Sequence, residues 1–303
     1  MSFASRRAFL KQLTYGAVGT STLFAQAGVA STKLSDNIFE ITGAGANILA
    51  LTSADGVLMV DGGLARNSAE VLKLVASLSN HQPVKVLFNT HWHPEATGAN
   101  EAVRKAGGKV MAHENTKLWM GTDVNVEWQK KVYPRNPVDA LPNDTFYING
   151  KLTFGTEIVE YGILPQAHTD GDIYVYLRQA NILMAGDLVS VGQYPILDYS
   201  SGGWIGGMAQ ASKALLAMTT AQTRIIPGSG PVQSRADLEA QSAMLATVMD
   251  RLLKLLRQGM SAKDMIAAAP TKEFDAKWGN PELFIANAYP GLWGHVREVG
   301  GIV

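Results

Sequence analysis

The sequence has no cysteine among its 303 residues. This absence excludes disulfide bonds, thiolate metal ligands, a cysteine nucleophile and a lipid-modified cysteine anchor. A chain without disulfides is compatible with both oxidising and reducing compartments, so the localisation has to be inferred from another feature.

Charge is scarce as well. Only 17% of the residues are charged, below the roughly 25% that is typical of soluble domains. The 26 basic residues are balanced by 26 acidic ones, so the basic surface that nucleic acid requires is not indicated. We therefore expect a small-molecule substrate and no nucleic-acid partner. The hydrophobic content of 47% is enough for one sizeable core or two modest ones.

The N-terminal segment has the pattern of an export signal. Residues 5–11 read Ser-Arg-Arg-Ala-Phe-Leu-Lys, and a weakly apolar stretch diluted by Thr, Ser and Gly continues to Ala30. This pattern resembles a twin-arginine signal, and the stretch is too short and polar to span a membrane. Small residues at 25–27 and 29–30 offer two cleavage sites. We predict a signal over residues 1–30, export to the periplasm and no stable membrane insertion after cleavage.

Hydrophobic patterning predicts alternating strands and helices over residues 31–303, which we expect to form one domain. The expected strands are 38–41, 48–51, 57–60, 84–88, 109–112, 145–148, 151–154, 157–161, 172–177, 181–185 and 224–226. The expected helices are 68–78, 99–106, 208–218 and 235–257, with one or two short helices after Ser261. Asn149-Gly150 predicts a hairpin turn between two of the strands. The irregular, aromatic-rich residues 118–141 are predicted to cover a pocket or to pack as a surface loop.

Two histidines, His91 and His93, directly follow the expected buried strand at residues 84–88. Residues two apart on an extended chain point to the same side, so their ring nitrogens are able to converge on one point. Imidazole is the commonest metal ligand near neutral pH. The pair therefore indicates a metal site, although polar loop residues give the same pattern. His168, at a turn between strands, and Asp187, at a strand end, are the candidate partners.

Five segments, in order along the chain, resemble landmarks of the metallo-β-lactamase fold family. They are Thr-His-Trp-His-Pro at 90–94, Ala-His-Glu-Asn-Thr at 112–116, His-Thr-Asp-Gly-Asp at 168–172, Ala-Gly-Asp-Leu at 185–188 and Pro-Gly-Ser-Gly-Pro at 227–231. The resemblance covers nearly all of the chain after the signal. It implies an α/β fold, the αββα four-layer sandwich, in which two mixed β-sheets are flanked by helices and the metals lie at one edge between the sheets.

The chain departs from the family pattern at three positions. The family's first loop reads HxHxDH, whereas residues 91–96 read His-Trp-His-Pro-Glu-Ala. His168 matches the next family ligand, and Asp187 matches the carboxylate that often bridges two metals. The last family histidine, in Pro-Gly-His-Gly, is Ser229 here. The resemblance thus implies a complete first metal site and a depleted second one.

The metal ligands implied by the resemblance are His91, His93, His168 and Asp187. Three neutral imidazoles with an open fourth position are the ligand set of a catalytic zinc. The second position would have only oxygen ligands, from Glu95, Asp187 and Ser229, and such a set has little preference for Zn²⁺ over Mg²⁺ or Mn²⁺. We expect one Zn²⁺ per chain, with Fe²⁺ or Mn²⁺ as alternatives.

These residues predict a metal-dependent hydrolase that acts on an ester, lactone, thioester or β-lactam. In this hypothesis zinc generates the attacking hydroxide, Glu95 orients or deprotonates the water, and Asp187 is a fourth ligand or a hydrogen-bond acceptor beside the metal. Asp187 as a direct ligand would give four protein ligands, as in a structural zinc site.

Two alternatives remain open. The substitutions at residues 95, 96 and 229 favour a non-catalytic protein that has lost its second metal site. His91, His168 and Asp187 also form the two-histidine, one-carboxylate set that holds iron in mononuclear oxygenases. The sequence indicates neither the substrate nor the oligomeric state.

Overall fold

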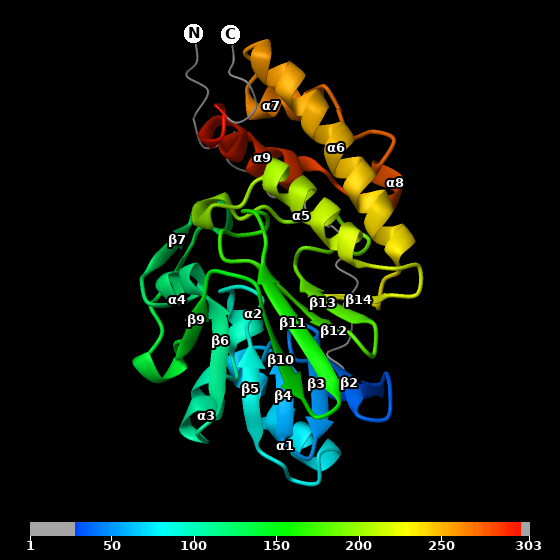
Figure 1. The fold of residues 1–303 in the computed structure, drawn as a ribbon. Helices are drawn as coiled ribbons and strands as arrows, with labels where there is room; N and C mark the ends of the chain where they lie inside the picture. The colour runs from blue at the N-terminus through cyan, green and yellow to red at the C-terminus, as the bar shows by residue number, and fades with distance from the viewer. Residues whose placement is uncertain (1–27, 298–303) are drawn as a thin grey trace.

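The structure, a computed structural model, describes residues 28–297. Most of the predicted export signal, residues 1–27, lies outside the described part of the chain. Two β-sheets pack against each other, and helices cover their outer sides (Figure 1). The predicted α/β sandwich of two mixed sheets flanked by helices is confirmed.

The first sheet has seven strands. In spatial order they are β1 (Ala30–Lys33), β2 (Ile38–Thr42), β3 (Ile48–Ser53), β4 (Gly56–Val60), β5 (Val84–Phe88), β6 (Lys109–His113) and β9 (Asp144–Phe146). Neighbours from β1 to β4 are antiparallel, and those from β4 to β9 are parallel. On its outer side lie α1 (Ser68–Leu78) and α3 (Asn100–Lys105), with the short α2 (Pro94–Thr97) and α4 (Glu114–Met120) in the connections.

The second sheet has five strands. They are β10 (Gly150–Phe154), β11 (Glu157–Ile163), β12 (Ile173–Leu177), β13 (Ile182–Gly186) and β14 (Arg224–Pro227), antiparallel except for the β13–β14 pair. Its outer face is covered by α5 (Ile205–Met218), α6 (Arg235–Arg257) and α9 (Glu282–Gly294), with α7 (Ala262–Ala267) and α8 (Asp275–Trp278) between the last two.

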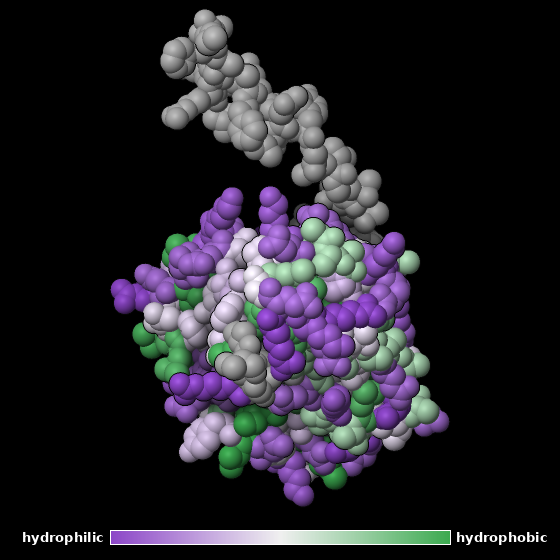
Figure 2. Space-filling model, turned by 90° about the horizontal axis from the view of Figure 1, so that it is seen from above, coloured by the Kyte–Doolittle hydropathy of each residue, from purple (hydrophilic) through white to green (hydrophobic). Residues whose placement is uncertain are grey.

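Alternating side chains of the strands build separate cores on the two faces of each sheet. In β4, Leu58 and Val60 pack between the two sheets, while Val57 and Met59 pack against the helices on the outer side. Because both faces are covered, the strand is apolar throughout, which explains its continuous hydrophobic run. α6 is instead amphipathic: it buries Leu245 against the second sheet. Figure 2 shows the face on the side of α6, α7 and α9, where hydrophilic side chains predominate.

Three expectations about connections need correction. Asn149-Gly150 does not form the predicted hairpin turn, because β9 pairs with β6 in the first sheet while β10, which begins at Gly150, pairs with β11 in the second. The segment therefore crosses between the sheets, and its local turn signal carried no information on which strands pair. Residues 118–141 contain a small two-stranded sheet, β7 (Val124–Val126) and β8 (Lys131–Tyr133). Between Ser261 and residue 297, where the described part of the chain ends, there are three helices rather than one or two.

Hydrogen bonds between loops join the two sheets at one end of the sandwich. The N–H of Ile173 in the second sheet donates to the carbonyl of Thr90, which follows β5 in the first (2.9 Å). The N–H of Asn47, in the β2–β3 turn, donates to the carbonyl of Gly228, which follows β14 (2.8 Å). The loops that carry the candidate metal ligands are therefore held together at this edge.

Candidate metal centre

The four predicted ligands meet at the edge between the two sheets, although they come from three separate loops. The imidazole rings of His91, His93 and His168 lie 4.8 Å apart, centroid to centroid, in all three pairs. Oδ2 of Asp187 lies 3.9 Å from Nε2 of His91 and 3.6 Å from Nε2 of His168. One potential ligand atom from each residue falls within 4.8 Å of the others, a spacing at which one metal ion fits between them.

A chain of hydrogen bonds from the end of β4 orients His91. Asp61 accepts hydrogen bonds from the backbone N–H and the hydroxyl of Thr90, both at 2.8 Å. Because that hydroxyl donates to Asp61, it accepts the Nδ1–H of His91 at 3.0 Å. The lone pair is then on Nε2, which is buried and has no hydrogen-bond partner among the described residues. Burial, with the charges of His93 and His168, lowers the pKa of His91 well below its usual value, so the ring is neutral.

His93 is oriented by Asp198, a residue 105 positions further along the chain. The Nε2–H of His93 donates to Oδ2 of Asp198 at 3.1 Å, which leaves Nδ1 facing His168. The fully buried Asp198 also accepts hydrogen bonds from Ser201 (2.6 Å) and Trp128 (3.2 Å). Burial alone would raise the pKa of Asp198, but the hydrogen bond and charge of His93, together with Ser201, lower it to about 2. Asp198 is therefore ionised and fixes the orientation of His93.

His168 is held by a backbone carbonyl. Its Nδ1–H donates to the carbonyl of Ile196 at 2.8 Å, so Nε2 faces the other two rings. Asp172 fixes the turn by accepting hydrogen bonds from the N–H (2.9 Å) and hydroxyl (2.7 Å) of Thr169. Burial lowers the pKa of His168, but the charges of Asp187 and Asp172 outweigh it and the net shift is upward. A metal ion entering the site must therefore compete with a proton on this ring.

The donor set fits a transition metal such as zinc. Each imidazole uses one nitrogen for a hydrogen bond to an oxygen and points the other at a shared position, which is the arrangement that fixes metal-binding histidines in proteins. The unpartnered Nε2 of His91 supports this reading, because buried polar atoms are normally satisfied. Whether these residues act as ligands stays a prediction.

Glu95 lies beside the three imidazoles. It is on α2, its side chain is 33% exposed, and its Oε1 is 3.8 Å from Nδ1 of His93. Ala96 is fully buried and offers no ligand atom. Gly228 passes close to Asp187: a Cβ at this position would lie 1.9 Å from Oδ1, so a larger residue there would displace the carboxylate. Of the residues that the family pattern assigns to a second metal, Glu95 and Asp187 thus offer oxygen atoms and Ala96 offers no ligand atom.

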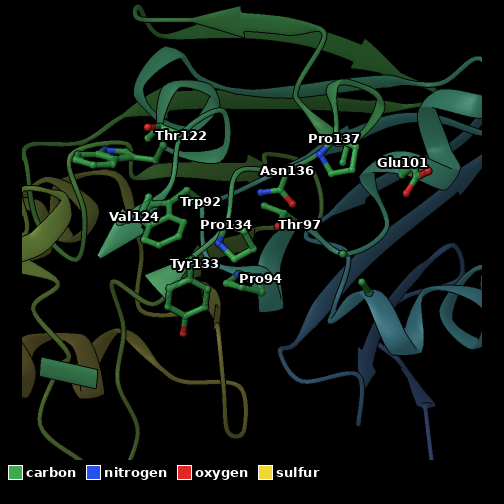
Figure 3. Close-up of a pocket in the computed structure, with 14 residues that line it drawn as sticks. Trp92, Pro94, Thr97, Glu101, Thr122, Val124, Tyr133, Pro134, Asn136 and Pro137 are labelled. Carbon is green, nitrogen blue, oxygen red and sulfur yellow. The ribbon is translucent and has the colours of Figure 1, made fainter. Parts of the chain in front are cut away.

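A cavity of about 290 Å³ lies behind the histidine loop and is covered by residues 118–141. Figure 3 shows Trp92, Tyr133 and Pro134 in its wall, and the Trp92 and Tyr133 rings meet edge to face with centroids 5.5 Å apart. Nε1–H of Trp92 donates to Ser201 at 3.0 Å, and Ser201 in turn donates to Asp198. The wall of this cavity is therefore connected to the carboxylate that orients His93.

Comparison with known proteins identifies the family. The model of the metallo-beta-lactamase superfamily matches residues 41–234, and the chain belongs to this superfamily. A metallo-beta-lactamase type 2 from Bacillus sp. (strain 170) is 25% identical over 187 residues, which make up 61% of this chain and 67% of that protein. The resemblance inferred from the sequence is confirmed.

Solved structures show the same fold. A metallo-beta-lactamase from Pontibacter korlensis aligns with a TM-score of 0.59 and 23% identity, over 72% of this chain and 99% of that one. The stereoselective inverting sec-alkylsulfatase Pisa1 from Pseudomonas sp. aligns with a TM-score of 0.69 and 17% identity, over 86% of this chain and 50% of that one. Because the two are named for different reactions, the fold alone does not select one for this chain.

The orientation of His93 gives a testable expectation. Asp198→Asn removes the negative charge that holds the Nε2–H of His93, and loss of such a supporting residue typically costs ~10–100-fold in metal affinity. Competition for zinc with a chromogenic chelator should show this loss. Asp275→Asn, which alters a carboxylate that accepts the hydroxyl of Tyr194 among the C-terminal helices, should leave the affinity unchanged. Equal zinc affinity of a folded Asp198→Asn variant and the wild type would contradict the role of Asp198.

Proposed function

We propose that the protein is an exported hydrolase that holds a single zinc ion with His91, His93 and His168 and cleaves a small carbonyl compound. The supporting observation is the convergence of three buried imidazoles, each with its remaining nitrogen hydrogen-bonded to an oxygen. Asp187 is the fourth ligand or a hydrogen-bond acceptor next to the ion. With one edge of the site open at Asp187 and Glu95, which are 26% and 33% exposed, water and substrate have access.

A zinc ion in this site supplies Lewis-acid chemistry, lowering the pKa of a coordinated water to about 7 and polarising a carbonyl oxygen. The chain itself supplies the proton transfers. Glu95, next to His93, orients the attacking water and takes one of its protons on a carboxylate oxygen. As the bond between the carbonyl carbon and the leaving group breaks, the same carboxyl returns the proton to the leaving atom. Hydrolysis is thereby balanced without a further reactant.

A single ion follows from the ligand chemistry. Glu95, Asp187 and Ser229 border the second position with oxygen atoms, and such ligands hold zinc much more weakly than imidazoles do. Fe²⁺ or Mn²⁺ in the first site is the alternative to zinc.

A hydrolysis screen of the four candidate substrate classes would show which of them the protein cleaves. Esters, lactones, thioesters and β-lactams should be assayed with zinc and with manganese added, and we expect hydrolysis of at least one class that a metal chelator abolishes. If no class is hydrolysed by metal-loaded protein, the non-catalytic alternative is favoured.

Glu95 provides the mechanistic test. Glu95→Gln keeps the size of the side chain but cannot accept a proton, so kcat should fall by ~10²–10⁴ with the zinc content unchanged. Steady-state kinetics and metal analysis of the same preparation measure both quantities. The matched substitution Glu70→Gln, on the exposed surface of α1, should leave kcat unaltered. If Glu95→Gln turns over as fast as the wild type, the proton-transfer role is wrong.

Export through the twin-arginine route is the second part of the proposal. Val29 packs against the core between the first sheet and its helices, and β1 begins at Ala30. Cleavage after Ala27 would keep both features, so we favour this position over cleavage after Ala30. Among the described residues, none of the helices combines the length and apolar character needed to cross a bilayer.

Replacing Arg6 and Arg7 together with lysine preserves the charge of the signal but removes the arginine pair. We expect the precursor to accumulate in the cytoplasm, as measured by cell fractionation and immunoblotting. Lys11→Arg, a conservative change outside the pair, should be exported normally. Periplasmic appearance of the twin-lysine protein at the wild-type level would exclude this route.

A further inference from the structure

A second cavity opens beside the metal centre, between the β2–β3 turn and the loop after β14. We call it the hairpin pocket; its volume is about 480 Å³, and its lining includes Glu40, Thr42, Asn47, Ser229 and Pro231. Ser229 also lines the small cavity that contains Asp187. The two cavities therefore adjoin at Ser229.

Hydrogen bonds fix the walls of the hairpin pocket. The side-chain amide of Asn47 donates to the carbonyls of Pro227 (3.0 Å) and Gly230 (2.7 Å), and its backbone N–H donates to the carbonyl of Gly228. Gly228 in turn lies against the carboxylate of Asp187. The pocket is therefore preformed and has a set position relative to the candidate metal ligands.

Glu40 is a buried acid without a partner in this pocket. It lies on β2, two residues from Ile38, so its side chain is on the face of the first sheet that packs toward the second. It is only 7% exposed, and its Oε1 is buried with no hydrogen-bond partner among the described residues. Burial raises the pKa of Glu40. A buried carboxyl group without a partner is costly, so its position in a pocket points to a ligand that satisfies it.

The charges around the two cavities are of one sign. Glu40 and Asp187 are the charged residues in the linings, and within residues 28–297 neither cavity is lined by lysine, arginine or histidine. A carboxylate in the hairpin pocket would meet no opposite charge. A cation would meet Glu40 at short range in a partly desolvated site, where charge pairing is stronger than in water.

We propose that the hairpin pocket binds a cationic group of the substrate, an ammonium or guanidinium, and that the carboxylate of Glu40 is its partner. This inference rests on the proposed hydrolase and specifies its substrates: the scissile carbonyl lies at the metal centre and the cationic end lies beyond Ser229. A bound positive charge also favours the ionised form of Glu40, so the cation and the carboxylate stabilise each other.

Binding of two small probes tests the proposal without any need for hydrolysis. Benzylammonium and benzyl alcohol have similar shapes, but only the first is charged at pH 7. Ligand-observed NMR titration of the wild-type protein should give a Kd for benzylammonium at least about tenfold lower than that for benzyl alcohol, since a hydrogen bond to a charged group contributes on this scale. Equal affinities for the two probes would overturn the proposal, and this comparison requires no variant.

Substitution then assigns the preference to Glu40. Glu40→Gln should weaken benzylammonium binding about tenfold and leave benzyl alcohol binding unchanged, whereas Glu282→Gln, at the exposed start of α9, should change neither. Because burial raises the pKa of Glu40, ionised Glu40 makes the folded protein less stable. A neutral glutamine does not carry this cost, so the Glu40→Gln variant should unfold at pH 7 at the same temperature as the wild type or a higher one. A folded Glu40→Gln variant that binds benzylammonium as tightly as the wild type would show that Glu40 is not the partner.

The outcomes separate this inference from the proposed function. Cation-selective binding that depends on Glu40, in a protein that hydrolyses nothing in the screen, retains the site and removes the hydrolase. Hydrolysis of carbonyl compounds by a protein that does not prefer the cationic probe retains the hydrolase and removes the site.

Discussion

The candidate site depends on hydrogen bonds to the outer nitrogens of its three histidines. An imidazole has two nitrogens, and only the one without a proton has a lone pair for a metal. In each ring the nitrogen that carries the proton donates a hydrogen bond to an oxygen. The acceptors are the hydroxyl of Thr90 for His91, the carboxylate of Asp198 for His93 and the carbonyl of Ile196 for His168. These acceptors direct the three lone pairs to one position.

The packing of the two sheets brings together the segments that carry the candidate ligands. In the first sheet, His91 and His93 lie in the loop that follows β5. In the second sheet, His168 lies in the loop between β11 and β12, and Asp187 directly follows β13. Packing of the two sheets brings these parts to one edge, and the hydrogen bond from Ile173 to Thr90 joins them there. The loss of the family's third loop histidine to Ala96 does not disturb this arrangement, because Ala96 is buried and its carbonyl accepts hydrogen bonds from Gly62 and Asn89.

Much of the fold, and four of the residues that meet at the edge, were predictable from the sequence. His91 and His93 were predictable because their spacing is local, and His168 and Asp187 because their order matches the family pattern. Asp198 was not predicted as a partner of His93, since no local pattern links residues 105 positions apart and carboxylates in loops are common. Glu40 was missed for a similar reason: it occupies an inward position of a strand that otherwise alternates normally. The Asn149-Gly150 error shows the converse: a local sequence signal for a hairpin turn was overridden, because β9 and β10 pair with strands of different sheets and Gly150 begins β10.

The most direct test of the account is the zinc content of the protein purified without oxygen and measured by mass spectrometry, for the wild type and for His168→Ala. If three imidazoles share one ion, the wild type carries one zinc per chain and the variant, which keeps two of the three imidazoles, loses it. Two zinc ions per wild-type chain, iron in place of zinc, or a full complement of zinc in the folded variant would contradict the account.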